Sequence, residues 1–340
     1  MNLKTNSFKL FKMMNNKSIL ITGGTGSLGK AITKHLLEKY PKVRKVIIFS
    51  RDEQKQFEMN QEFPIEKFSQ MRYFIGDVRD LNRLERAFID VDYVIHCAAM
   101  KHVPIAEYNP DECIKTNIFG AQNIINAALK SKVKKVIALS TDKASSPVNL
   151  YGATKLTSDK LFIAANNIKG NDPIGFSVVR YGNVMGSKGS VIPFFLQKKK
   201  EGIIPITDPN MTRFNISLQE GVNLVLFAIE NSLGGEMYVP KIPSYNIMDL
   251  ADAIAPECKK EIIGIRQGEK IHEEMISESD SFNTYDIGKY YIIIPNNIIE
   301  LKEHIIRKYN AKLIKSGFNY NSKDNPDRET IESLREKLNL

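Results

Sequence analysis

The sequence predicts an α/β protein with a doubly wound parallel sheet and a smaller C-terminal lobe. Two observations support this prediction. Short runs rich in Val and Ile alternate with helical patterns through the first half of the chain, and continuous apolar strands are typical of a parallel sheet covered on both faces. A glycine-rich turn directly follows the first apolar run, and this arrangement is typical of a nucleotide-binding turn between a strand and a helix.

The expected elements follow one another as strand, helix, strand, which indicates a doubly wound sheet. Expected strands cover residues 18–22, 45–49, 72–75, 92–97, 135–140 and 176–181. Expected helices lie near 27–39, 80–88, 111–130 and 151–166. The regularity then weakens, since later segments are rich in Gly, Pro and Asn or mix short elements. We therefore expect a disordered extension over 1–16, a Rossmann domain over 17–182, and mainly a substrate-binding lobe over 183–340, with some segments returning to the sheet.

The composition indicates a globular protein in a reducing compartment. Of the 340 residues, 42% are hydrophobic and 26% are charged, which argues against disorder. Cys97, Cys113 and Cys258 show no CxxC spacing, so we expect buried thiols. No apolar run approaches the roughly 18 residues of a membrane span, and the expected location is the cytoplasm. The net charge of +9 is spread along the chain and the five histidines are scattered, so neither a nucleic-acid surface nor a metal site is expected.

The turn sequence ITGGTGSLGK predicts a dinucleotide site. Gly23, Gly26 and Gly29 lie between the first strand and the first helix. Glycines at these positions let the backbone turn tightly and let a pyrophosphate approach the N–H groups of a helix N-terminus. The flanking elements favour this interpretation over a plain turn. Expected cofactor contacts in the turn also include Thr25, Ser27 and Leu28.

The end of the second strand favours NADP over NAD. An NAD-binding protein often carries an acid there to bind the ribose 2′-hydroxyl, whereas Ser50 and Arg51 offer a hydroxyl and a guanidinium suited to a 2′-phosphate. Asp52 argues against this interpretation. The GDVRD run could hold the adenine edge or cap a helix at Asp80. Further expected cofactor contacts are Lys55, Asp77, Val78, Cys97, Ala98, Lys101 and Val184.

A Tyr-x-x-x-Lys spacing predicts an acid/base pair that assists the oxidation of a hydroxyl-bearing carbon. Tyr151 and Lys155 would lie on one face of a helix. The Lys155 ammonium would lower the phenol pKa from about 10, so that the phenolate accepts a proton as hydride leaves a hydroxyl-bearing carbon. The spacing recurs at Tyr285 and Lys289, but only Tyr151 follows a strand ending in STD, where Thr141 could join the pair.

Together these features resemble the extended short-chain dehydrogenase/reductase family over nearly the whole chain. The resemblance rests on GDVRD, MKHVPIAEYNP, LSTDKA, NLYGATK, RYGNVMGSKGSV, MTRF and IGIRQGEKIHE. It implies a Rossmann fold, a tightly bound and recycled NADP, a nucleotide-sugar substrate and a homo-oligomer between a dimer and a hexamer. Within the family, these motifs are similar to the branch that dehydrates UDP-N-acetylglucosamine with inversion at C5, the first step of pseudaminic acid biosynthesis.

Such a dehydration needs a second acid/base pair. After C4 is oxidised, a base removes the C5 proton, an acid protonates the departing C6 hydroxyl, and hydride returns to C6. Asp142 and Lys143 stand where retaining sugar dehydratases of the family carry Asp-Glu. One hypothesis makes Lys143 the C5 base and Asp142 the acid, which requires both pKa values to shift. The reverse assignment needs no such shifts and stays open, as does a purely structural loop with a capping aspartate and a solvated lysine.

The resemblance also implies substrate contacts. They are Lys101, Lys143, Asn183, Arg213, Arg266 and Glu269. His102 could be a ligand contact or a structural hydrogen-bonding residue. Two rival interpretations remain: a sugar 4-epimerase, which needs the tyrosine pair but no elimination pair, and a non-catalytic NADP-binding regulator, against which the intact tyrosine pair argues.

Overall fold

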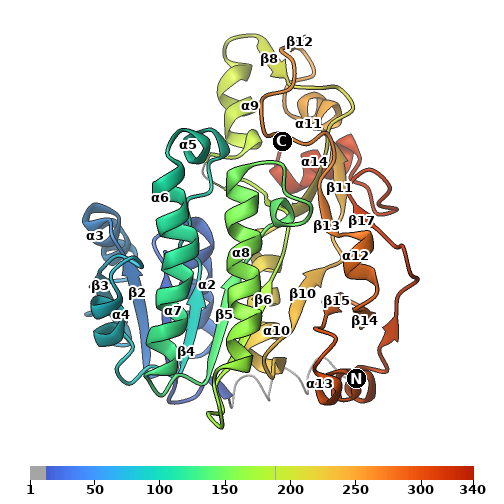
Figure 1. Cartoon of the computed structure of the whole chain (residues 1–340). Coiled ribbons are helices and arrows are strands. Elements are labelled where there is room, and N and C mark those ends of the chain that lie inside the picture. The colour runs from blue at the N-terminus through green and yellow to red at the C-terminus, as the bar shows by residue number, and fades with distance from the viewer. Residues whose placement is uncertain (1–12, 188) are drawn as a thin grey trace.

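A large sheet forms the centre of the computed structural model, which describes residues 13–187 and 189–340 (Figure 1). Among the described residues this sheet has ten strands. The parallel ones are, in spatial order, β3 (Met71–Ile75), β2 (Lys45–Ser50), β1 (Ser18–Thr22), β4 (Tyr93–His96), β5 (Lys135–Leu139), β6 (Gly175–Val179) and β10 (Met237–Pro240). The antiparallel ones are β15 (Tyr290–Ile293), β14 (Thr284–Asp286) and β16 (Lys312–Leu313). The predicted doubly wound α/β fold is confirmed, and its order reverses between β1 and β4, where such sheets bind ligands.

Helices cover both faces of this sheet, as its apolar strands require. One face carries α2 (Ser27–Lys39), α3 (Glu53–Glu62), α10 (Leu218–Asn231) and α13 (Ile299–Tyr309). The other carries α4 (Leu81–Ala87), α7 (Gly120–Leu129) and α8 (Leu150–Ala164), which lie in front of the strands in Figure 1. The strand interiors are almost wholly buried between these layers.

The helix expected over 111–130 is not one regular helix. It consists of α6 (Pro110–Ile114), a π-helical turn (Lys115–Phe119) and α7. The π-helical turn contains the buried Asn117, whose amide donates to the Met100 carbonyl at 2.9 Å and to the Thr154 hydroxyl at 3.0 Å. It therefore joins the loop after β4 to the helix α8. A widened turn of this kind has no signature in apolar periodicity.

Within residues 17–182, two α-helices were not expected, α3 and α5 (Val103–Tyr108). In α3 only Gln56 and Met59 are buried, so the apolar periodicity that would reveal the helix is almost absent. Its signal is instead the N-cap: the Asp52 carboxylate accepts from the Lys55 N–H at 3.0 Å.

Beyond residue 182 the chain alternates between the sheet and a smaller lobe with its own apolar core. The lobe lies beyond the carboxyl ends of the parallel strands, at the top of Figure 1. Its main elements are α9 (Val191–Lys199), β8 (Ile203–Ile206), β11 (Ser244–Asn246), α11 (Ile247–Ile254), β12 (Lys259–Ile262) and α14 (Ile331–Leu338). Between lobe and sheet lie β7 (Asn183–Val184), β9 (Thr212–Ile216), β13 (Glu274–Ile276), α12 (Glu278–Ser281) and β17 (Tyr320–Asn321).

Most of the extension expected over 1–16 lies outside the described residues. Within the described part, Met14 is buried in the apolar cluster that contains α2 and α10. None of the helices in the described ranges has the length and apolar character that crossing a membrane requires.

Candidate active site

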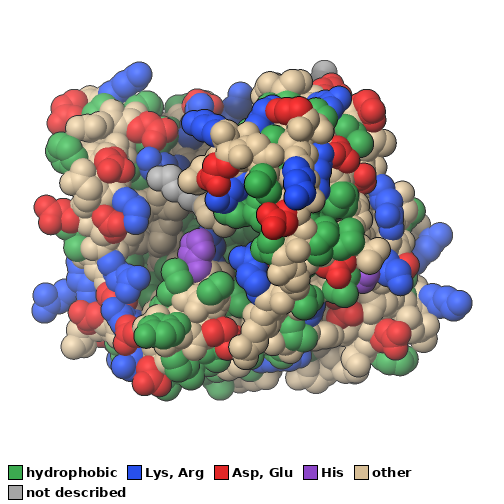
Figure 2. All heavy atoms as spheres, turned by 90° about the horizontal axis from the view of Figure 1, so that it is seen from above, with side chains coloured by type: hydrophobic (Ala, Val, Ile, Leu, Met, Phe, Trp, Pro, Cys, Tyr) green, Lys and Arg blue, Asp and Glu red, His purple; other side chains and the backbone are tan. Residues whose placement is uncertain are grey.

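A cavity of about 890 Å³ opens between the carboxyl edge of the parallel strands and the C-terminal lobe. Figure 2 looks onto this end of the molecule and shows it hollowed, with Lys and Arg side chains around the hollow. The volume lies within the range of cofactor and substrate sites. It is lined from both sides, by the glycine turn and the ends of β2 to β5, and by residues 181–184, 187, 189–191, 268–270 and 273.

The glycine turn forms the cofactor end of the cavity. Gly23 has φ of +61°, and a Cβ there would lie 2.9 Å from the backbone N and Cα of Ala98. Only glycine therefore allows β1 and β4 to approach here. Every predicted cofactor residue except Lys155 lines this cavity: Gly23, Thr25, Gly26, Ser27, Leu28, Gly29, Ser50, Arg51, Lys55, Asp77, Val78, Cys97, Ala98, Lys101, Tyr151 and Val184.

At the end of β2, Arg51 is the side chain best placed for an anionic group. Its guanidinium is more than half exposed and lies 3.6 Å from the Asp77 carboxylate. Asp52, which argued for NAD, caps α3 and pairs with the Lys55 ammonium at 2.5 Å. Asp80 caps α4 through the Arg83 N–H, which confirms the capping interpretation of the GDVRD run. Asp77 lines the cavity, and its contact with the adenine edge stays a prediction.

Helix α8 places Tyr151 and Lys155. Its N-cap is Asn149, whose side chain accepts from the Gly152 N–H at 2.7 Å. A Cβ on Gly152 would lie 2.2 Å from the Lys143 carbonyl oxygen, so glycine lets the turn of Asp142–Ala144 pack directly against the helix. Tyr151 lines the cavity, whereas Lys155 is buried and does not line it.

The second Tyr-x-x-x-Lys match lies elsewhere. Tyr285 is in β14 near the far edge of the sheet and packs against the apolar core. Neither Tyr285 nor Lys289 is among the residues that line the cavity. The strand context in the sequence therefore separates the two matches correctly.

The predicted lowering of the Tyr151 pKa is not what the structure shows. Burial raises the pKa of Tyr151 to about 12, against the opposing effects of the Lys143 charge and a hydrogen bond with Thr141. Burial also lowers the pKa of Lys155, opposed by Asp159. The prediction considered one cation and neglected the desolvation of a phenol in a closed site.

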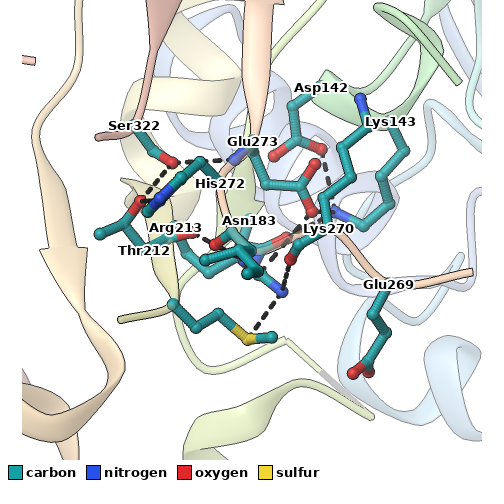
Figure 3. A network of polar contacts seen from close by, with 12 residues as sticks. Asp142, Lys143, Asn183, Thr212, Arg213, Glu269, Lys270, His272, Glu273 and Ser322 are labelled. Atoms are coloured by element: carbon teal, nitrogen blue, oxygen red, sulfur yellow. Dashed lines mark hydrogen bonds and ion pairs between the residues drawn. The ribbon is translucent and has the colours of Figure 1, made fainter. Parts of the chain in front are cut away.

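Asp142 and Lys143 lie at the centre of a polar network (Figure 3). The Lys143 ammonium lies 3.0 Å from Asp142 Oδ1, 3.2 Å from Glu273 Oε1 and 3.3 Å from Asn183 Oδ1. Asp142 Oδ1 also accepts from the Thr141 hydroxyl at 2.9 Å. Lys143 lines the cavity, whereas Asp142 is fully buried and does not.

The charges in this network favour one of the two assignments left open by the sequence. Burial acts to lower the pKa of Lys143, but the Asp142 and Glu273 carboxylates outweigh it and raise that pKa. Burial raises the pKa of Asp142, with Lys143 opposing. A neutral Lys143 acting as base would need the opposite shift of the lysine. Lys143 as acid needs no reversal, whereas the raised pKa of Asp142 is the direction that Asp142 as acid would need, so the preference for Lys143 as acid rests on the lysine.

The predicted substrate residues divide into two groups. Lys101, Lys143, Asn183, Arg213 and Glu269 line the cavity. Arg266 does not: its side chain is 61% exposed and pairs with Glu269 at 3.0 Å. Arg213 donates to the backbone carbonyls of Thr212, Lys270 and Ile271 at 2.7 to 3.0 Å. Arg213 therefore holds the backbone of residues 270 and 271 in place. The prediction that it binds pyrophosphate does not account for these contacts.

Sequence reasoning missed Lys270 and Glu273, which both line the cavity. Both belong to the IGIRQGEKIHE run, of which the sequence prediction includes only Arg266 and Glu269. The Lys270 ammonium donates to the Ser145 carbonyl at 2.7 Å. A charged side chain every third or fourth residue in a loop is a weak signal, and only the fold brings this run beside Asp142–Ala144.

A Rossmann sheet with a Tyr-x-x-x-Lys helix beside its ligand cavity is typical of the short-chain dehydrogenases/reductases. A family model described as polysaccharide biosynthesis protein matches residues 19–295. The chain is 58% identical over 334 residues to the UDP-N-acetylglucosamine 4,6-dehydratase (inverting) of Campylobacter jejuni subsp. jejuni, covering 96% of this chain and 98% of that protein. It is 43% identical over 288 residues to a UDP-glucose 4-epimerase of Rickettsia canadensis, covering 83% and 84%.

Among solved structures, Pen from Bacillus thuringiensis matches with a TM-score of 0.87 and 39% identity over 96% of this chain and 98% of that one. Structures that hold NAD match at 20 to 23% identity and show the shared fold alone. The chain therefore belongs to the polysaccharide biosynthesis protein family, within the extended short-chain dehydrogenases/reductases.

Proposed function

We propose that the protein dehydrates UDP-N-acetylglucosamine across C4 to C6 and inverts C5. The observation that carries this proposal is that one cavity is lined by Tyr151, Thr141 and Lys143, with Asp142 buried behind Lys143 at 3.0 Å from its ammonium. The product would be UDP-2-acetamido-2,6-dideoxy-β-L-arabino-hex-4-ulose, in the first step of pseudaminic acid biosynthesis. The identity to the C. jejuni dehydratase supports the same substrate.

The bound nicotinamide would supply hydride acceptance from C4 and hydride return to C6. Tyr151 accepts the C4 hydroxyl proton, while the buried Lys155 contributes positive charge to the site. Asp142, buried directly behind Lys143, would have to meet C5 at the cavity wall to take its proton, and Lys143 gives its proton to the departing C6 hydroxyl, which leaves as water. The pair is restored when the proton passes from Asp142 to Lys143 across 3.0 Å. The proton taken up by Tyr151 balances the one that C5 receives from its opposite face.

A sugar 4-epimerase remains the second candidate, because relatives with that name share the scaffold. An epimerase needs the Tyr151 chemistry but no elimination. A buried aspartate held 3.0 Å from a cavity-lining lysine has no function in epimerisation, and this favours dehydration. A non-catalytic regulator would have no need for either pair.

The first experiment is turnover in deuterated water without added cofactor. Purified protein with UDP-N-acetylglucosamine is expected to give a 4-keto-6-deoxy sugar that carries deuterium at an inverted C5, followed by proton NMR. Turnover without added cofactor would mean that the bound dinucleotide is recycled. Retained configuration at C5 would refute inversion, and plain C4 epimerisation would favour the second candidate.

The cofactor is expected to be NADP rather than NAD. Denatured protein should release NADP, and Arg51→Ala should weaken reconstitution with NADP relative to NAD by about tenfold or more, since a hydrogen bond to a charged group contributes about 1.5–3 kcal/mol. Arg44→Ala is the control, because Arg44 pairs with Asp90 outside the cavity lining. An unchanged NADP/NAD ratio in Arg51→Ala would refute the predicted 2′-phosphate contact.

A further inference from the structure

Glu273 is a buried carboxylate at the reaction cavity that the proposed chemistry does not yet use. Its side chain is only 3% exposed, yet it lines the cavity. Oε1 lies 3.2 Å from the Lys143 ammonium and 3.7 Å from Arg213 Nε. Oε2 is buried and has no hydrogen-bond partner among the described residues. A buried carboxylate oxygen without a partner is unfavourable in a purely structural role, so Glu273 calls for a functional explanation.

Lys143 lies between two buried carboxylates. Asp142 and Glu273 contact the same ammonium at 3.0 and 3.2 Å. If Lys143 lost its proton, both carboxylates would lose their nearest cation, and an uncompensated buried charge is strongly destabilising. The geometry therefore keeps the lysine charged, and two carboxylates from different chain segments fix where its ammonium can lie.

Glu273 belongs to a segment that holds the Asp142–Ala144 turn from the opposite side. The Asn149 amide donates to the Gly268 carbonyl and the Lys270 ammonium donates to the Ser145 carbonyl, both at 2.7 Å. Glu274 accepts from the Ser145 hydroxyl at 2.8 Å. Residues 268–274 thus hold the turn and the start of α8 through several hydrogen bonds. Within this segment, Glu273 contacts the Lys143 ammonium.

We propose that Glu273 is a positioning residue of the elimination step, whose carboxylate holds the Lys143 ammonium as a cation at the cavity wall, ready to protonate the C6 hydroxyl. This inference rests on the proposed dehydratase function. It assigns Glu273 no contact with the sugar: it acts through Lys143. Burial acts to raise the pKa of Glu273, but Lys143 and, after it, Arg213 outweigh burial and lower that pKa, so the carboxylate stays charged.

The test compares Glu273→Gln and Glu273→Asp with the wild type over a range of pH. Both variants should reduce the bound cofactor on mixing with UDP-N-acetylglucosamine as fast as the wild type, because Tyr151 serves that step. The alkaline limb of the kcat profile should move to lower pH, by about one to three units in Glu273→Gln, which removes an opposite charge within 4 Å of Lys143, and by less in Glu273→Asp, which retracts the charge. KM should not change.

Glu261→Gln is the matched control, because Glu261 is an exposed glutamate of β12 in the C-terminal lobe. Its kcat profile should equal that of the wild type. An unshifted alkaline limb in both Glu273 variants would overturn the inference, and so would a parallel loss of cofactor reduction. Faster turnover at neutral pH, with the acid limb moved down, would make Lys143 the base and overturn it as well. If Glu273→Gln does not fold, the smaller shift in Glu273→Asp decides alone. A wild type that forms no 4-keto sugar would overturn the proposed function together with this inference.

Discussion

Replacing Tyr151 by Phe is expected to remove C4 oxidation, and with it every later step. The phenol is the only hydroxyl of the Tyr-x-x-x-Lys pair, and it lines the cavity beside Thr141. General acid/base groups typically contribute about 10²- to 10⁴-fold to a rate, so kcat should fall by about that factor. Mixing with UDP-N-acetylglucosamine should give no absorbance of reduced nicotinamide and no deuterium at C5.

The chain offers its own control for this substitution. Tyr285→Phe removes the hydroxyl of the second Tyr-x-x-x-Lys match, which lies in β14 and outside the cavity lining, and should leave turnover unchanged. Both variants should keep the bound cofactor, because Phe preserves the ring packing. Normal cofactor reduction in Tyr151→Phe would show that another group takes the C4 hydroxyl proton.

The pH dependence of C4 oxidation should also reflect the protonation state of the Tyr151 phenol. Because burial raises its pKa to about 12 in the ligand-free protein, the phenol stays protonated at neutral pH until further positive charge enters the site. Oxidised nicotinamide carries such a charge.

Much of the fold and of the cofactor end could be predicted because their signals are local. A strand, a glycine turn and a helix follow one another without a gap over residues 18–39. At Gly23 a side chain would collide with the backbone of Ala98, which the neighbouring strand brings close in a Rossmann turn. Tyr151 and Lys155 lie four residues apart on one helix, so their spacing in the sequence is enough to place both side chains on the same face. These features required no knowledge of distant contacts.

The elimination site could be predicted only in part because its electrostatics are not local. Asp142 and Lys143 are neighbours in sequence, but Glu273 lies 130 positions further along than Lys143 and reaches it through the packing of β13 beside the Asp142–Ala144 turn. From the pair alone, the pKa of Lys143 could be argued in either direction. In the folded protein Asp142 and, after it, Glu273 outweigh burial and raise that pKa. In the same way, the sequence gives no indication that the Arg213 guanidinium is engaged by backbone carbonyls.

Replacing Lys143 by Met is expected to stop the reaction after oxidation. Cofactor reduction should proceed and the reduced form should persist, while formation of the 4-keto-6-deoxy product falls by about 10²- to 10⁴-fold. If Lys143 is the acid and Asp142 the base, deuterium should still enter C5 of the oxidised sugar in Lys143→Met and should not enter it in Asp142→Asn. The opposite pattern would restore the hypothesis that Lys143 is the C5 base.

A stability measurement separates this loss from simple misfolding. Lys143→Met leaves two buried carboxylates without their shared cation, and breaking a buried pair in this way typically costs about 3–5 kcal/mol. Burial already raises the pKa of Asp142. A carboxyl whose pKa is higher in the folded than in the unfolded protein stabilises the fold at a pH below its unfolded-state pKa of about 4. It loses that contribution as the pH rises. The melting temperature of Lys143→Met should therefore approach that of the wild type as the pH falls toward 4. Lys289→Met, which removes the lysine of the second match, should match the wild type throughout. A deficit in Lys143→Met that does not change with pH would mean that the two carboxylates are not the source of the instability.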